Sequence, residues 1–234
     1  MLKCGTSQTA FIAHPPCTPS ARAGFLPERR ANVITKDELA VRLKNACAEV
    51  RAAEDELTEI DSHFGDADHG LTMCKIANAI EGAVDASEGG IQEMLDDVAM
   101  GVMVLNGGSA VPLWNTWLDG LQEEAPEGDS VDAAQIKAMF ANALEELSDM
   151  SGAVVGDKTM MDAFIPACEA IAACEGDEAA LFDSAAAAAE EGAENSKNFP
   201  SRFGRAKSYG DKTIGTPDAG AVSMARFFRG LAKA

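Results

Sequence analysis

The sequence predicts an all-α protein with a single folded domain. From Thr35 to near the carboxyl end, apolar residues recur at the three-to-four-residue spacing of amphipathic helices. Runs of β-branched residues with period-two alternation, which would indicate strands, do not occur. Eight helical segments are joined mostly by short links, and short links favour antiparallel neighbours. We therefore expect one antiparallel eight-helix domain over residues 35–234, of all-α class.

Start signals or apolar stripes mark each of the first four helices. Thr35-x-x-Glu38 matches a capping box, so the first helix begins there. The second begins near Gly70, and the pair Gly107-Gly108 separates the third from the fourth. The third and fourth helices are predicted over 91–105 and 109–121. The apolar stripes of the first two helices comprise Leu39, Leu43, Ala46, Val50 and Leu57, followed by Met73, Ile76, Ala77 and Ile80.

The last four helices are predicted from capping residues and composition. Asp157 is of the residue type that caps helices and is the expected N-cap of the sixth helix. For the eighth helix Thr216 suits the cap, Pro217 the first helical position and Asp218 the positive helix end. The predicted bounds are 131–147 for the fifth helix, from Asp157 for the sixth, 177–191 for the seventh, and from Thr216 to Leu231 for the eighth.

Only the connection over 192–215 is long. Loops of this length inside a compact domain are often functional. This one is polar and contains glycine, and it concentrates basic side chains in an otherwise acidic chain. They are Lys197, Arg202, Arg205, Lys207 and Lys212.

The charge is strongly negative and unevenly placed. The chain of 234 residues has a formal net charge of −19, but residues 1–32 hold four basic side chains against Glu28, a net of +3. The remaining residues therefore carry −22, which argues against binding to nucleic acid or to anionic membranes. We interpret residues 1–34 as a disordered extension, with an organelle-targeting peptide as the alternative. No apolar run reaches the 18 residues of a membrane-spanning helix.

The cysteines indicate a reducing compartment. The six cysteines form no C-x-x-C pair and no cysteine/histidine cluster with zinc spacing. Cys4 and Cys17 lie in the extension, and the other four lie within helical patterns, where a free thiol behaves as a small apolar group. We therefore expect a cytoplasmic protein.

Three carboxylates crowd the segment before the second helix, at Asp61, Asp66 and Asp68. Crowded carboxylates repel one another unless a cation neutralises them, and hard oxygen ligands suit Mg²⁺ or Ca²⁺. The helix start that follows offers free N–H groups and a positive dipole end, which favour phosphate. Metal and phosphate sites thus coincide, as phosphoryl transfer requires. The alternative is an Asp-rich, solvated turn that only caps helices.

Other signals in the sequence are weaker. Each of the segments 107–109, 156–159 and 218–220 is either a phosphate contact or an ordinary turn or helix start. His63 and His69 are either general bases or metal ligands, or groups that support the carboxylates from outside; the last is the more common case beside a hard cation.

Four separated segments together resemble a known family. They are IDSHFGDADHG (60–70), GGSAVPLW (107–114), GDKTMMDAFIPA (156–167) and GRAKSYGDKTIGTPDAG (204–220). They resemble the nucleotide-binding L subunit of bacterial dihydroxyacetone kinases and the equivalent C-terminal domain of the single-chain ATP-dependent enzymes. The resemblance covers about residues 35–233 and implies an eight-helix antiparallel barrel with the nucleotide at one end.

The resemblance also implies a set of site residues. Asp61, Asp66 and Asp68 match the family's ligands for Mg²⁺, two ions of which bridge the phosphates, and Arg205 matches a cationic helper in catalysis. Two motifs depart from the family pattern, with Ala110-Val111 before the proline of the second segment and Leu71-Thr72 after the metal site. The residues that match contacts to ADP or ATP are His69, Gly70, Leu71, Thr72, Gly108, Ser109, Ala110, Gly152, Met161, Arg205, Asp218, Ala219 and Gly220.

In the family, this chain would present a phosphoryl group to dihydroxyacetone held on a separate K-type subunit. The sequence leaves open whether ATP or a phosphotransferase-system phosphocarrier supplies the phosphoryl group, and whether the chain forms a homodimer. Erythrulose or another short ketose is an alternative acceptor. A nucleotide-bound regulatory module without catalysis is an alternative of another class.

Overall fold

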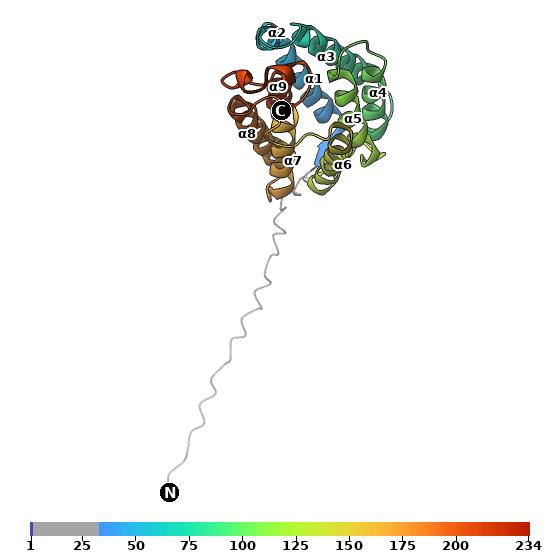
Figure 1. Ribbon diagram of the computed structural model, residues 1–234. Helices are drawn as coiled ribbons and strands as arrows, with labels where there is room; N and C mark the ends of the chain where they lie inside the picture. Colours follow the sequence, from blue (N-terminus) through green and yellow to red (C-terminus); the bar gives the residue numbers. More distant parts are fainter. Residues whose placement is uncertain (2–32) are drawn as a thin grey trace. The chain divides into compact units, whose positions relative to one another are not determined.

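The computed structural model describes Met1 and residues 33–234 of the chain, and this part is almost entirely helical (Figure 1). The proposed extension over 1–34 therefore lies mostly outside the described residues, as do Cys4 and Cys17. The elements are β1 (Val33–Thr35), α1 (Lys36–Ala52), α2 (Glu54–Ser62), α3 (His69–Ala86), α4 (Ile91–Met103), α5 (Ala110–Glu123), β2 (Ser130–Asp132), α6 (Ala133–Ser151), α7 (Met161–Ala173), α8 (Glu178–Asn195), η1 (Ser196–Asn198), η2 (Arg205–Thr213) and α9 (Ala219–Leu231).

Eight of the helices form a closed ring. Along the chain α3 to α9 pack each on the next, α1 packs on α3, and α9 returns to pack on α1. The helix α2 contacts α3 and α9 and lies outside this order. The eight-helix arrangement expected from the sequence is thus confirmed within residues 33–234. None of the described helices is long and apolar enough to cross a membrane.

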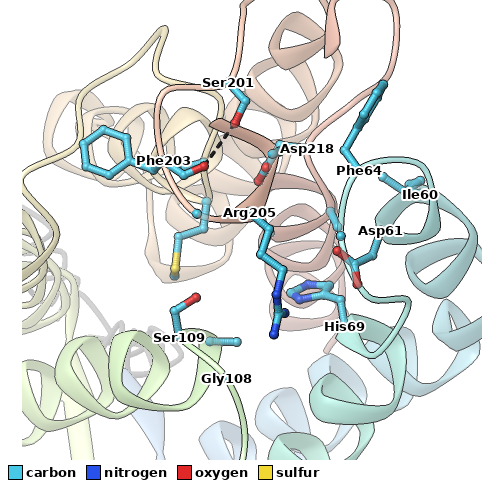
Figure 2. Close-up of a pocket in the computed structure, with 18 of the residues that line it drawn as sticks. Ile60, Asp61, Phe64, His69, Gly108, Ser109, Ser201, Phe203, Arg205 and Asp218 are labelled. Atoms are coloured by element: carbon cyan, nitrogen blue, oxygen red, sulfur yellow. Dashed lines mark hydrogen bonds between the residues drawn. The ribbon is translucent and has the colours of Figure 1, made fainter. Parts of the chain in front are cut away.

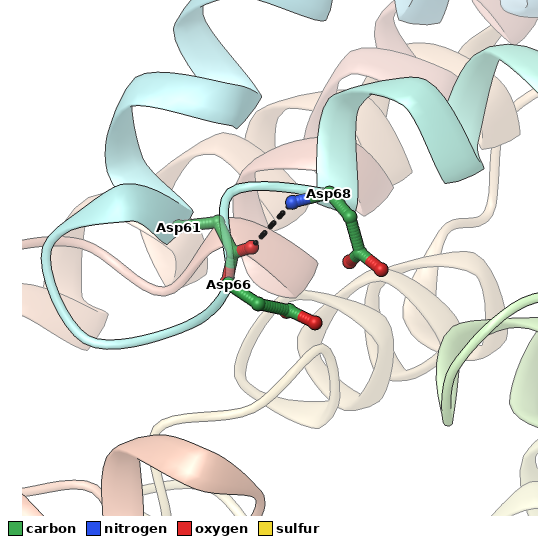
Figure 3. Close-up of side chains that lie close together, drawn as sticks. All are labelled: Asp61, Asp66 and Asp68. Carbon is green, nitrogen blue, oxygen red and sulfur yellow. Dashed lines mark hydrogen bonds between the residues drawn. The ribbon is translucent and has the colours of Figure 1, made fainter.

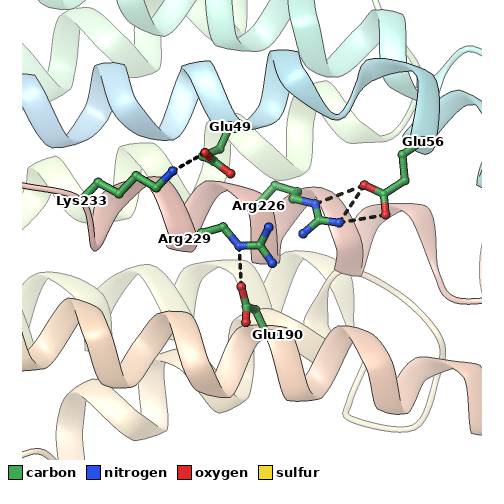
Figure 4. Close-up of polar contacts among 6 residues, drawn as sticks. All are labelled: Glu49, Glu56, Glu190, Arg226, Arg229 and Lys233. Carbon is green, nitrogen blue, oxygen red and sulfur yellow. Dashed lines mark hydrogen bonds and ion pairs between the residues drawn. The ribbon is translucent and has the colours of Figure 1, made fainter.

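Close backbone approach and ion pairs hold α9 in the ring. A Cβ on Gly230 would lie 2.2 Å from Cα of Ala46, so glycine lets α9 pack directly on the backbone of α1. Figure 4 shows the ion pairs at this junction. They are Arg226 with Glu56 of α2, Arg229 with Glu190 of α8, and Lys233 with Glu49 of α1.

Aromatic side chains fill the core of the ring. Trp114 and Trp117 of α5 are 1% and 0% exposed, and both meet Phe227 of α9 edge-on at centroid distances of 5.2 and 5.4 Å. Such pairs contribute roughly 0.5–1.5 kcal/mol each beyond their buried area. Cys47 and Cys168 are buried free thiols in the core, which fits the apolar role expected of them. Cys74 and Cys174 are half-buried, and the thiol of Cys74 donates to the carboxylate of Glu54.

Three helix boundaries differ from the sequence prediction. The first predicted helix is divided at Ala53, and the second piece, α2, runs on to Ser62. The sixth begins at Met161, four residues after Asp157. In the eighth Asp218 is the N-cap instead of Thr216, because its carboxylate accepts a hydrogen bond from the N–H of Ala221.

The strands were not expected. Ile34 pairs with Val131 in a two-stranded antiparallel ladder, which begins the described domain at Val33, two residues before the expected start. Three residues are too few to show a period of two, so the sequence carries no signal for them. The predicted capping box of Thr35 and Glu38 is present, and the 192–215 connection contains the end of α8 and two 3₁₀ helices.

The antiparallel ring brings the four motifs to one end. Because neighbouring helices alternate in direction, every second connection returns to the same end of the ring. These connections are the α2–α3, α4–α5, α6–α7 and α8–α9 segments. Each contains one of the motifs singled out from the sequence.

Candidate functional site

A pocket of about 380 Å³ lies at this end of the ring and is lined by all four connections (Figure 2). Its floor includes Trp114, which continues into the aromatic core. Ser201 and Phe203 line the side formed by the α8–α9 segment, where the Ser201 hydroxyl donates to the Phe203 carbonyl at 3.2 Å. The pocket is therefore apolar at its base and polar where the motif loops meet.

The three predicted carboxylates converge on the wall of this pocket (Figure 3). One oxygen from each of Asp61, Asp66 and Asp68 lies within 4.8 Å of the other two. Asp61 is half-buried, and the other two are exposed. Three hard oxygen donors at this spacing are the ligand type that Mg²⁺ or Ca²⁺ prefers. The donor set therefore fits a divalent cation.

The backbone of the α2–α3 loop produces this convergence. The N–H of Asp68 donates to Oδ2 of Asp61 at 3.1 Å, which ties the end of the loop to its beginning (Figure 3). A Cβ on Gly65 would lie 2.0 Å from Oδ1 and 2.9 Å from the carbonyl oxygen of Asp61, so a side chain here would displace the Asp61 carboxylate. Ala67, between Asp66 and Asp68, has a φ of 59°. This left-handed conformation costs about 1 kcal/mol or more for a residue with a side chain, and such strain clusters at functional sites.

The α8–α9 segment reaches across to the same loop. The guanidinium of Arg205 forms an ion pair with Asp66. Four residues further along η2, the ring of Tyr209 contacts that of Phe64 at a centroid distance of 5.2 Å. Arg205 is thus placed beside the carboxylates.

His69 lies at the pocket wall but turns toward α9. Its Nε2 lies 3.1 Å from Oγ of Ser223, whose hydroxyl donates to the carbonyl of Gly220. The Ser223 oxygen therefore accepts from the imidazole. Burial lowers the pKa of His69 against the opposing effect of Asp61 and Asp68, which favours the neutral ring. This places His69 as a support for the start of α3 and not as a metal ligand.

Most of the other predicted contact residues also line the pocket. They are Thr72, Gly108, Ser109, Ala110, Asp218, Ala219 and Gly220. The first turns of α3 and α5 have no side-chain cap, so their N–H groups are available from two sides, and a helix N-terminus favours an anion. At α9 the carboxylate of Asp218 already accepts from the N–H of Ala221.

Four predicted contact residues are absent from the pocket lining. Gly70 is buried against α2, where a Cβ would lie 2.2 Å from the carbonyl oxygen of Glu54. Leu71 is 52% exposed in the first turn of α3. Gly152 ends α6 with a φ of 63°, and Met161 is fully buried at the start of α7. Gly70 and Met161 therefore have packing roles. Their place in a motif does not distinguish packing from contact with a ligand.

Buried polar groups hold the motif loops in place. Lys158 donates to the carbonyl of Ser196 at 2.8 Å and to that of Thr216, and burial lowers its pKa. Asp162 accepts from the N–H groups of Gly156 and Thr159 at 2.6 and 2.7 Å. Burial raises the pKa of Asp218 to about 7. Lys158 thus joins the α6–α7 and α8–α9 connections, and its ammonium is committed to backbone carbonyls.

Several lining residues carried no signal in the sequence. Ile60, Phe64, Leu113, Met160, Ser201 and Phe203 all line the pocket. Each is an apolar or hydroxyl residue inside or beside a motif, and such residues are common in any core. Only the convergence of the connections shows their place.

The fold and site define an all-α domain with a carboxylate cluster and three helix N-termini around one pocket. Residues 63–233 match the DAK2 domain, and the chain belongs to this family. It is 35% identical over 201 residues to D-erythrulose kinase of Mycolicibacterium smegmatis, covering 83% of this chain and 35% of that one. It is 28% identical to the ADP-binding subunit DhaL of the PEP-dependent dihydroxyacetone kinase of Escherichia coli, covering 80% and 92%.

Solved structures share the fold. Dihydroxyacetone kinase of C. freundii in its native form aligns with a TM-score of 0.66 at 22% identity, covering 96% of this chain and 38% of that one. The complex of that enzyme with AMP-PNP and Mg²⁺ aligns with a TM-score of 0.63 at 21% identity. This chain spans about a third of the length of the D-erythrulose kinase and the L-erythrulose 1-kinase of M. smegmatis.

Proposed function

We propose that the chain is the nucleotide-binding component of a ketose kinase, which holds ADP or ATP with Mg²⁺ and presents the phosphoryl group to a ketose bound on a separate K-type subunit. The observation that carries the proposal is the placement of three convergent carboxylates beside helix N-termini in one pocket. The match to almost the whole length of the E. coli ADP-binding subunit supports the separate-subunit role.

The residues of the site divide the work. Asp61, Asp66 and Asp68 would hold Mg²⁺, which when bound supplies positive charge for the phosphate oxygens. The N–H groups at the starts of α3 and α5 bind phosphate oxygens through the positive helix ends. Arg205 adds a guanidinium at the carboxylate wall. The apolar floor at Trp114 leaves room for the base. In this scheme the chain positions the nucleotide and neutralises the charge of its phosphates, and it needs no general base.

The surface around the pocket suits a docked partner. Among the described residues, every exposed large hydrophobic side chain except Met1 and Val41 lies at or beside the pocket-end connections. Exposed apolar side chains gathered at one end of a molecule are typical of a protein contact. We assign it to the K-type subunit, because the acceptor must reach the mouth of the pocket. The residues are Leu71, Met100, Met103, Val104, Met150, Val154, Val155, Phe203, Tyr209 and Ile214.

The acceptor is either dihydroxyacetone or a tetrulose. The 35% and 32% identity to two erythrulose kinases favours a tetrulose as the second candidate. Rates on dihydroxyacetone, D-erythrulose and L-erythrulose with the cognate K-type subunit decide between them. The same assay with ATP alone, and then with a phosphocarrier and phosphoenolpyruvate, identifies the phosphoryl donor.

The decisive experiment combines nucleotide binding with phosphoryl transfer. Calorimetry should show that ADP binds in the presence of Mg²⁺ and binds weakly in EDTA. With a K-type subunit and a phosphoryl donor, ketose phosphate should form. Val154→Asp, on the exposed α6–α7 loop, should lower transfer while leaving ADP affinity unchanged, with Val41→Asp at the far end as the control. If the chain bound no nucleotide with Mg²⁺, the proposal would be refuted.

A further inference from the structure

Two contacts join the α2–α3 loop to η2, beside the pocket, and one of them involves a candidate metal ligand. Arg205 pairs with Asp66, and Tyr209 packs on Phe64. Both partners lie within the loop that carries the carboxylates, and both contacting residues lie within Arg205–Thr213. The two contacts together form a clasp between the loop and η2.

We propose that, when no metal is bound, the guanidinium of Arg205 neutralises Asp66 in place of the cation. Binding of the cation then opens this clasp and frees Arg205. This inference rests on the metal-binding part of the proposed function. Arg205 is then a positioning residue before the nucleotide binds, and binding of the metal changes the position of η2.

Crowding makes the three carboxylates repel one another. Three negative groups within 4.8 Å repel one another, and a guanidinium at Asp66 relieves part of that repulsion. The carboxylate of Asp61 accepts from the N–H of Asp68, whereas that of Asp66 pairs with the guanidinium of Arg205. A divalent cation that binds all three oxygens takes over this compensation with twice the charge. The ion pair then loses much of its Coulomb energy, and Arg205 becomes available to an anion.

The first part of η2 lies between two glycine bends. Arg205 follows Gly204, whose φ of 60° and ψ of −158° form a sharp bend that suits glycine. A second glycine, Gly210, breaks η2 internally with a φ of 53°. In the part of the chain that the structure describes, Arg205 is 67% exposed and Tyr209 is 46% exposed. Few buried contacts thus oppose a shift of this segment between two glycine bends.

The single tyrosine of the chain makes the movement measurable. Tyr209 is the only tyrosine in the sequence, so biosynthetic 3-fluorotyrosine gives one ¹⁹F resonance that needs no assignment. Its contact with Phe64 makes the chemical shift sensitive to opening of the clasp. The resonance of the full-length wild-type chain should move when Mg²⁺ is added without nucleotide.

Arg205→Gln is the test variant, and Lys207→Gln is the matched control. Arg205→Gln removes the ion pair, so Mg²⁺ should bind the nucleotide-free chain about threefold to fivefold more tightly, the equivalent of an exposed ion pair. Its ¹⁹F resonance should start near the Mg²⁺-saturated position of the wild type. Lys207→Gln removes one charge from the same helix and should keep wild-type behaviour in 0.15 M salt, where the Debye length is about 8 Å.

The outcomes separate this inference from the proposed function. Unchanged or weaker Mg²⁺ binding by Arg205→Gln, or a wild-type resonance that stays still while calorimetry records Mg²⁺ binding, overturns the clasp and leaves the metal site intact. Equal tightening in Lys207→Gln also overturns it, because general charge would then explain the effect. If the wild type bound no Mg²⁺ with or without nucleotide, the proposed metal site would fail, and the inference with it.

Discussion

Asp68→Asn tests the metal site with little disturbance to the fold. The side chain of Asp68 is exposed and makes no capping hydrogen bond, although it stands at the N-cap of α3. Its structural contacts come from the backbone, where its N–H donates to Asp61 and its carbonyl accepts from Thr72. Asparagine preserves the size of the side chain and both backbone contacts. The variant therefore removes one negative charge and leaves the loop intact.

The expected loss follows from Coulomb's law. Because Asp68 is exposed, the dielectric constant near its oxygens is close to that of water. A unit charge and a divalent cation at the Mg²⁺–oxygen distance of about 2.1 Å then interact by about 4 kcal/mol. This energy corresponds to roughly a thousandfold in affinity, of which the amide oxygen of asparagine recovers a part. We expect Mg²⁺ affinity to fall at least a hundredfold, by the same conversion.

Calorimetric titration of Mg²⁺ into the ADP-saturated chain measures this loss, and circular dichroism checks that helicity is retained. Asp97→Asn is the control, because Asp97 is exposed on α4, outside the pocket lining, and its loss changes the net charge equally. Equal Mg²⁺ affinities for the two variants would refute the assignment of Asp68 as a ligand.

Three other predictions concern the fold and its ionisable groups. Gly230→Ala should lower the free energy of unfolding by about 3 kcal/mol, because the new Cβ meets the backbone of Ala46. Urea unfolding measures this loss, and an unchanged midpoint would contradict the close packing of α9 on α1. Asp218 has a pKa raised by burial from 3.8 to about 7, so its contribution to stability is complete below pH 3.8 and is lost as the pH rises to 7. Asp218→Asn should therefore be the more stable protein at pH 8 by roughly 1–4 kcal/mol and lose that advantage near pH 4, and equal urea midpoints at pH 8 would contradict this. Burial raises the pKa of the Cys47 thiol to about 12, and burial with the Glu54 hydrogen bond raises that of Cys74 to about 11. Iodoacetamide at pH 8 should thus label neither in the native chain, as read by peptide mass spectrometry, and rapid native labelling of Cys47 would show that α1 opens.

Much of the fold can be predicted from the sequence because helices are local. The apolar stripes, the capping box at Thr35 and the glycine pair at 107–108 depend on residues a few positions apart, and the structure has helices at each predicted place. The errors occur where local signals compete. Thr216, Pro217 and Asp218 all suit a helix start, and only the hydrogen bond of Asp218 with Ala221 shows which residue caps. The break at Ala53 has no glycine or proline to mark it.

The carboxylate cluster was also predictable, since its three members lie within eight residues. The contacts across the pocket were not. Phe64 meets Tyr209, and Lys158 meets the carbonyls of Ser196 and Thr216, only because alternate connections of an antiparallel ring return to one end.

The sequence by itself determined the helices, the carboxylate cluster and the family of this protein, because each depends on neighbouring residues or on motifs read in order. The tertiary structure decided which motif residues face the pocket and which only pack. Gly70 illustrates the division: it stands inside the most specific motif, yet it touches α2 and allows α3 to begin where the carboxylates converge. Packing alone sets the relative orientation and the distance of segments that lie far apart in the chain, and local sequence patterns do not predict either.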